Sequence, residues 1–152
     1  MVSVKINVSF GNLKRNLNSV ISRARNPERG LRKIAPWGLQ SLQTNFKEEA
    51  SGYEAVKRWA PLAESTRKER ARKLGAAFAA HPILQRTKKL LNSIRYKVKT
   101  NVLTYYTQTR YAQYHVTGTH NMPARNFMII RKHVIERMAK YIISWVFENF
   151  GK

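Results

Sequence analysis

The segment that decides the fold reads Tyr111-Ala-Gln-Tyr-His-Val-Thr-Gly-Thr-His-Asn-Met-Pro-Ala-Arg-Asn-Phe127. Its first residues, up to His115, fit one turn of a helix, and Gly118 supplies the permissive backbone on which such a turn ends. Pro123 favours an extended residue before it, and residues 126–130 have the composition of a buried strand. The segment therefore predicts a one-turn helix, a loop and a strand that returns the chain to the core.

Alternation of apolar and polar residues predicts further strands. Residues 2–10 alternate strictly, which is the two-residue period of a strand with one buried face. Residues 94–98 alternate in the same way, and a turn near residues 100–101 would pair them with residues 103–107. This pairing predicts a hairpin with one apolar and one basic face.

Apolar residues at three- and four-residue spacing predict the helices. A first helix covers residues 13–24 and a second covers residues 28–49, where Pro36 should kink or split it, because proline removes a hydrogen bond and clashes with the preceding turn. A shorter helix begins with a capping box at Thr66, and an amphipathic helix over residues 134–146 can cover one face of the sheet. We therefore expect an α+β domain, in which a small, mainly antiparallel β-sheet packs against several helices, including the long C-terminal one.

Length and composition limit the class of protein. A chain of 152 residues is predicted to form a single domain over residues 1–152. There is no cysteine, which excludes disulfide and thiolate chemistry, and the first residues lack the unbroken apolar region of a signal peptide. No apolar stretch approaches the roughly 20 residues that a membrane span needs. The sequence thus predicts a protein that is made and used inside a cell, or assembled into a particle there, with no membrane partner.

The ionisable residues argue against catalysis. All 8 acidic residues are glutamates, which disfavours sites that hold two metal ions with several carboxylates and excludes an aspartate-oriented triad. The histidines, His81, His115, His120 and His133, lack the spacing of zinc ligands. We therefore predict no catalytic residue, no metal site and no cofactor. His115 is expected to hold its helical turn against the next loop through its ring nitrogens.

Positive charge dominates the composition. The chain has 29 Lys and Arg residues against 8 acidic ones, a formal net charge of +21, so it should attract polyanions or acidic proteins. Basic residues are concentrated between Lys57 and Lys99, and the aromatic residues among them suit a packed protein interface. Sequence-independent attraction to DNA phosphates is the alternative, since no known nucleic-acid motif is present. The candidate contacts are Arg67, Lys68, Arg70, Arg72, Lys73, Arg95, Lys97 and Lys99.

Two side chains are candidates for a subunit interface. Trp37 projects off the apolar stripe of its helix, so it is either covered by another element or offered to a partner. Arg125 could bind a carboxylate or backbone carbonyls, and so lock its own loop or a neighbouring subunit, or it could be solvated. The sequence leaves these alternatives open.

The central segment resembles a known family. The pattern Tyr-Ala-x-x-His-x-x-Gly followed by Pro-Ala-Arg-x-Phe resembles the signature of the virion morphogenesis proteins of tailed bacteriophages, also called tail completion proteins. Upstream, Trp59-Ala-Pro-Leu62 with Ser65-Thr66, and residues 83–87 with residues 90–94, occur in the family's order. The residues that match the family motif are Trp59, Pro61, Leu62, Thr66, Tyr111, Ala112, His115, Gly118, Pro123, Ala124, Arg125 and Phe127. Two residues depart from the pattern: Lys88 stands where a glycine is expected, and Asn126 where a second proline is usual.

The resemblance implies a function. It predicts a non-enzymatic structural protein of the phage head-tail neck or tail terminus, which forms an oligomeric ring that joins or completes the tail. Its partners would be copies of itself, other neck and tail proteins, and DNA that passes through the ring. Its location would be the virion, after assembly in the host cytoplasm. A sequence-independent DNA-binding protein that uses a basic face is the alternative from another class.

Overall fold

The computed structural model describes residues 11–51 and 57–148, so the strand predicted at residues 2–10 lies outside the described residues. Within the described part, helices and two antiparallel strand pairs confirm the predicted α+β class. The elements follow in the order α1 (Gly11–Arg25), α2 (Glu28–Glu48), β1 (Ala50–Ser51), β2 (Lys57–Arg58), α3 (Glu64–Leu74), the 3-10 helix η1 (Ala76–Phe78), α4 (Lys89–Ser93), β3 (Ile94–Lys99), β4 (Val102–Thr107), α5 (Ala112–Thr117) and α6 (Lys132–Val146).

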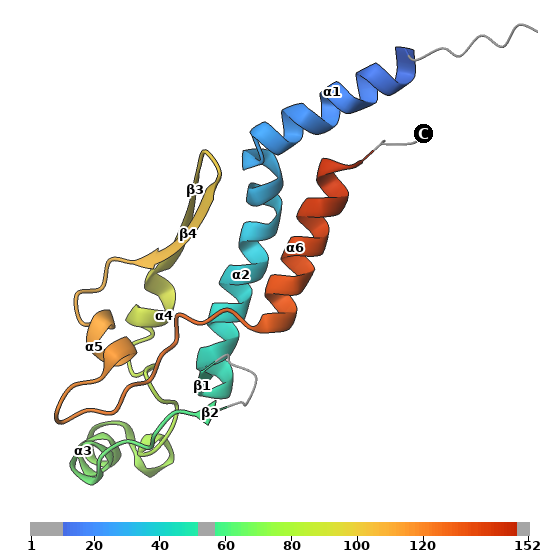
Figure 1. Cartoon of the computed structure of the whole chain (residues 1–152). Coiled ribbons are helices and arrows are strands. Elements are labelled where there is room, and N and C mark those ends of the chain that lie inside the picture. The colour runs from blue at the N-terminus through green and yellow to red at the C-terminus, as the bar shows by residue number, and fades with distance from the viewer. Residues whose placement is uncertain (1–10, 52–56, 149–152) are drawn as a thin grey trace, which may run out of the picture.

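Helix α2 is the centre of the described structure, with the hairpin β3–β4 on one side and α6 on the other (Figure 1). A smaller cluster joins Ile34 of α2 to Val134 and Met138 of α6. The apolar positions of α2 thus serve two clusters, one toward each neighbour. The larger cluster contains Leu42, Phe46, Trp59, Ile83, Leu90, Ile94, Ala112 and Phe127.

The predicted hairpin forms, with its turn at residues 100–101. Tyr96 lies opposite Tyr105 and Val98 lies opposite Leu103, on the apolar face. The hydroxyl of Tyr105 donates a 2.8 Å hydrogen bond to the carbonyl oxygen of Ala35, which fixes the hairpin against α2. Burial raises the pKa of Tyr105 to about 12, so the phenol stays neutral at physiological pH.

Helix α2 continues through Pro36, which was expected to kink the helix or split it; the helix is not split. Pro36 and Arg32, whose carbonyl loses its partner to the proline, are both exposed, so water can satisfy this carbonyl. Gly38 leaves room for the Tyr105 ring: a Cβ atom at Gly38 would lie 2.1 Å from the Tyr105 hydroxyl oxygen.

The prediction of a strand at residues 126–130 is wrong, because this largely buried stretch has no regular secondary structure. The side chain of Asn45 on α2 donates from Nδ2 to the carbonyl oxygens of Phe127, at 3.1 Å, and of Ile129, at 2.7 Å. Phe127 is 0% exposed, so the prediction of burial is confirmed. The segment returns to the core as expected, but a helix side chain satisfies its backbone where a neighbouring strand was predicted to do so.

Two helix predictions also need correction. Helix α3 begins at Glu64 after Ala63, without a side-chain cap, so the predicted capping box at Thr66 is wrong. Glu64 lies in the first turn, where a negative charge is favourable. Helix α6 packs along α2, not across the sheet, and a Cβ atom at Gly30 of α2 would lie 2.7 Å from the Trp145 ring. The small residue therefore lets the two helices approach closely.

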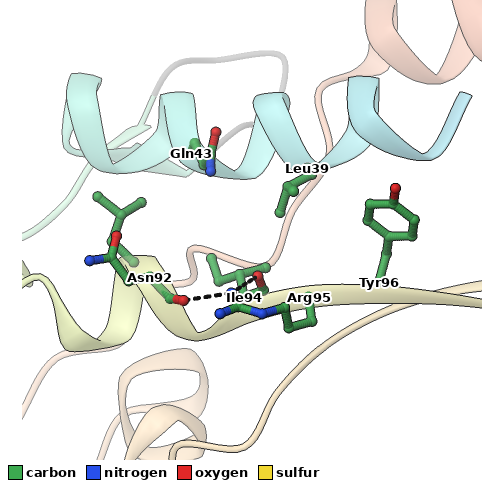
Figure 2. Close-up of a pocket in the computed structure, with 7 residues that line it drawn as sticks. Leu39, Gln43, Asn92, Ile94, Arg95 and Tyr96 are labelled. Atoms are coloured by element: carbon green, nitrogen blue, oxygen red, sulfur yellow. Dashed lines mark hydrogen bonds between the residues drawn. The ribbon is translucent and has the colours of Figure 1, made fainter.

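A groove of about 730 Å³ lies between α2 and β3 (Figure 2). Its lining residues are Leu39, Gln43, Leu91, Asn92, Ile94, Arg95 and Tyr96.

Candidate functional site

The matching segments of the sequence meet in one junction. The ring of Phe46, on α2, lies 5.6 Å from that of Trp59 and 5.2 Å from that of Phe127, measured between centroids. Ala112 of α5 is buried in the same cluster, and Leu62 packs against it while half-buried. The aromatic residues of the family motif therefore join the two ends of the matched region around one helix.

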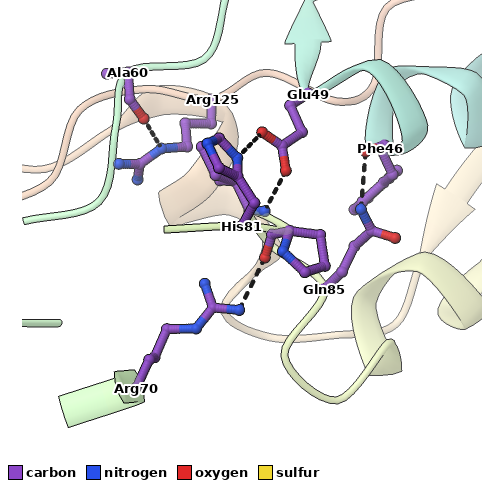
Figure 3. Close-up of polar contacts among 9 residues, drawn as sticks. Phe46, Glu49, Ala60, Arg70, His81, Gln85 and Arg125 are labelled. Atoms are coloured by element: carbon purple, nitrogen blue, oxygen red, sulfur yellow. Dashed lines mark hydrogen bonds and ion pairs between the residues drawn. The ribbon is translucent and has the colours of Figure 1, made fainter. Parts of the chain in front are cut away.

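Arg125 ties this junction together (Figure 3). Its Nε atom donates to the carbonyl oxygen of Ala60 at 2.8 Å, and its Nη2 atom donates to that of Pro61 at 2.7 Å. The residue is 4% exposed, and burial lowers the pKa of its guanidinium. Of the alternatives left open by the sequence, the described structure shows Arg125 bound to backbone carbonyls of its own chain; its role as a subunit contact stays a prediction.

Gly118 ends α5 at a φ of 76°, which favours glycine. A Cβ atom there would also lie 2.9 Å from the backbone nitrogen of Ala124. The next residues make a tight turn, in which Thr119 and Met122 exchange backbone hydrogen bonds of 2.8 and 3.1 Å. Pro123 and Ala124 are exposed on this loop. The glycine thus lets the loop fold back onto the end of its own helix.

His115 holds the loop through its backbone. The backbone nitrogen of Arg125 donates a 2.6 Å hydrogen bond to the carbonyl oxygen of His115. The ring packs edge-on against Tyr111 at 5.7 Å, and its buried Nδ1 atom has no hydrogen-bond partner among the described residues. The expected contact with the loop is thus made by the carbonyl, not by Nδ1. Burial, and after it the nearby Arg125, lower the pKa of His115 and favour its neutral form.

A second set of contacts, which the sequence did not reveal, closes the other end of the junction (Figure 3). Glu49 ends α2 in the left-handed region at a φ of 52° and accepts hydrogen bonds from the Ile83 backbone nitrogen, at 2.7 Å, and from His81 Nδ1, at 2.5 Å. Arg70 is 5% exposed and donates to the Pro82 carbonyl oxygen at 3.0 Å. These side chains hold the segment that follows η1 against α2 and α3.

The other predicted basic contacts lie on the surface. Arg67, Lys68 and Lys73 pair with glutamates of their own helix, at 3.3, 3.8 and 2.8 Å. Arg72 of α3 and Arg95, Lys97 and Lys99 of β3 are exposed as well. Arg70 is the exception, because it is buried. The exposed members of the predicted set therefore form two surface groups, on α3 and on the hairpin, and no contact among the described residues joins them into one site.

Trp37 lies against α6. Its ring meets that of Tyr141 edge-on at 5.3 Å, and the Arg137 guanidinium lies 4.4 Å from its centroid. The ring is half-buried in this position. Of the two alternatives, coverage by another element is what the described chain shows, and contact with a neighbouring subunit stays a prediction.

The polar side chains of this junction connect segments that are remote in sequence. Arginine, glutamate and asparagine side chains bind backbone groups of remote segments, and within residues 11–51 and 57–148 no three histidine or glutamate side chains gather as metal ligands would. Among the described helices none is long and apolar enough to cross a membrane.

Comparison with known proteins agrees with this picture. The profile of the phage virion morphogenesis family matches residues 8–146. Searches of curated proteins and of solved structures gave no significant match. The match covers the whole junction and both helices that flank it, and it confirms the resemblance that the signature segment suggested. The chain belongs to the phage virion morphogenesis family.

Proposed function

We propose that this chain is a structural, non-enzymatic protein of the phage head-tail neck or tail terminus, and that it forms an oligomeric ring that joins or completes the tail. The family match over residues 8–146 carries the proposal, since it assigns the chain to bacteriophage virion assembly. The junction around Arg125 supports it, because its buried contacts build a scaffold.

The surface supports a role in assembly. Helix α1 leads away from the rest of the structure (Figure 1), and its Leu17 and Ile21 are 42% and 45% exposed. On α6, Ile135 and Ile143 are more than half exposed, and so is Phe147, which follows the last residue of the helix at the same four-residue spacing. Apolar surface of this kind is typical of protein interaction sites. We infer that both helices contact other subunits or neighbouring virion proteins.

The charge favours acidic neighbours. In a ring, a net charge of +21 on each copy would bring like charges within about 8 Å, the Debye length at physiological salt, so other groups must neutralise them. Acidic surfaces of adjoining neck and tail proteins suit this requirement, with a minority of the basic residues facing DNA inside the ring.

Light scattering after size-exclusion chromatography tests the ring. We expect a mass that is a fixed multiple of 17.7 kDa, and closed rings of matching size in negative-stain images. A mass of one chain at every concentration would overturn the proposal.

Binding to random-sequence duplex DNA over a salt series tests the role of the charge. We expect a shallow slope of log affinity against log salt, because few basic residues contact phosphates and each contact contributes about −0.9 to the slope. Tight, sequence-selective binding above physiological salt would instead identify a DNA-binding protein.

A further inference from the structure

We propose that residues 2–10 of one copy add as a strand to the free edge of β3 in a second copy, with their apolar side chains in the groove between α2 and β3. The inference rests on the proposed function, because it names the contact by which neighbouring subunits of the ring hold one another. It assigns the groove and the N-terminal segment to a single interface.

The groove lies at the edge of β3. Strand β4 pairs with one edge of β3, and no β4 residue lines the groove. Ile94 and Tyr96 line it from one face of β3 while Arg95 lines it from the other, an arrangement that occurs where a pocket lies beside a strand edge. Figure 2 shows Leu39 and Gln43 of α2 across the groove from these residues. The groove therefore offers apolar contacts next to a strand edge that is unpaired in the described chain.

Only part of this edge is covered by the chain itself. The Arg95 Nη1 atom donates to the carbonyl oxygens of Asn92, at 2.5 Å, and of Ile94, at 2.9 Å, and so caps the start of the strand. Within the part of the chain that the structure describes, no side chain caps the backbone of residues 96–99 in this way. A two-stranded sheet is marginal in water on its own, and a third strand stabilises it.

The N-terminal segment has the sequence that this edge requires. Its strict alternation places five apolar side chains on one face and polar side chains on the other. Backbone hydrogen bonds to the strand edge would supply affinity, and the apolar side chains would fit among Leu39, Leu91 and Tyr96. The apolar residues are Val2, Val4, Ile6, Val8 and Phe10.

The position of α1 favours a second copy as the acceptor. A helix of 15 residues is about 22 Å long, and the groove begins beside Leu39, about 16 Å along α2 from Glu28. Figure 1 shows α1 leading away from α2 and the hairpin, so both lengths add to the distance between the start of α1 and the groove of the same chain. Residues 2–10 span at most about 30 Å when extended. To reach the groove of its own chain, the segment would need most of its length for the connection, and few residues would remain to pair with β3. A neighbouring copy placed beyond α1 can instead receive the whole segment as a strand.

The interface explains the shape of the chain. Contact between the segment of one copy and the groove of the next joins two different surfaces, and such head-to-tail contacts close into rings when the rotation between copies is right. Helix α1 would then bridge two subunits, which gives Leu17 and Ile21 a surface to cover.

Cysteine cross-linking tests the contact, because the chain has no cysteine of its own. One preparation carries Gln43→Cys, at the rim of the groove, and a second, size-tagged preparation carries Val4→Cys, Ile6→Cys or Val8→Cys. After mixing and mild oxidation we expect covalent pairs of one tagged and one untagged chain, and none when Lys140→Cys of α6 replaces Gln43→Cys. Absence of mixed pairs with all three partners would overturn the proposal. So would a chain with both cysteines that forms only an internal disulfide.

A paired set of variants separates this inference from the ring itself. Replacing Val4 and Ile6 by serine should shift the assembly toward single chains, with an apparent affinity at least tenfold weaker, while Lys5→Ser with Asn7→Ser should leave it unchanged. Light scattering reads the mass, and circular dichroism checks the helices. Equal assembly in both pairs would overturn the groove contact and leave the ring standing, whereas a single-chain mass for the unmodified protein would overturn the ring.

Discussion

Arg125 donates from Nε to the carbonyl oxygen of Ala60, at 2.8 Å, across 65 residues of sequence. The same guanidinium donates to the next carbonyl, that of Pro61, at 2.7 Å. One arginine thereby fixes the loop that carries Trp59 against the loop that follows α5. Because both acceptors are backbone groups, the interaction depends on the shape of the guanidinium more than on its charge.

Replacing Arg125 by methionine should therefore destabilise the fold. Two carbonyl oxygens would lose their buried donor, at about 1–3 kcal/mol each, so we expect a loss of about 2–6 kcal/mol in the free energy of unfolding. Urea denaturation measures it, and Arg110→Met, at an exposed residue, is the matched control. If Arg125→Met kept wild-type stability but lost assembly, the residue would be a subunit contact and not an internal tie.

Replacing Lys88 by glycine should stabilise the protein. Lys88 has a φ of 53°, in the left-handed region, at the position where the family pattern has glycine. Relief of this backbone strain outweighs the added freedom of the unfolded chain, so we expect a gain of about 0.5–1 kcal/mol. Lys89→Gly, in the first turn of α4, removes the same charge and should instead destabilise. Equal losses in both variants would show that the strain at Lys88 is negligible.

Replacing Gly38 by alanine should destabilise the protein, although alanine is normally the better helix residue by about 1 kcal/mol. The new methyl group would lie 2.1 Å from the Tyr105 hydroxyl oxygen and 2.4 Å from the ring carbon that bears it. We expect a loss of about 2 kcal/mol or more, as in overpacked cores. Adding Tyr105→Leu should recover part of the loss, whereas additive losses in the double variant would exclude this clash as the cause.

Local patterns predicted the elements whose own residues repeat with the period of a helix or a strand. The hairpin followed from alternation on either side of residues 100–101, and α6 followed from its spacing of apolar residues. Residues 126–130 were assigned to a strand because burial and composition are the same for a strand and for an irregular segment. What decides between them is Asn45, which supplies two hydrogen bonds from 82 and 84 residues away.

The site was predictable in its members but not in its contacts. The signature identified Trp59, Arg125 and Phe127, and the structure brings them together around α2. Nothing in the sequence indicated that Arg70, within a run of basic residues, would be buried, because its partner is a backbone carbonyl. The hydrogen bond that Glu49 accepts from the Ile83 backbone could not be predicted either. The residues at the end of a helix do not indicate which loop, here 34 residues later, will contact it.

The stability of the protein should fall in mild acid because of His115. Burial, followed by the nearby Arg125, lowers its pKa below the ordinary 6.5 in the folded state. Below about pH 6.5 the unfolded chain therefore binds a proton that the folded chain does not, and the free energy of unfolding decreases until the folded pKa is passed. Urea denaturation between about pH 7.5 and pH 5.5 measures this loss. The pKa values of Glu48 and Glu69 are lowered from the ordinary 4.5, so both carboxylates stay charged over this pH range and do not contribute to the change. In His115→Gln the decrease should be smaller, while His120→Gln, at an exposed residue, should behave like the unmodified protein. The same decrease in all three proteins would exclude His115 as its source.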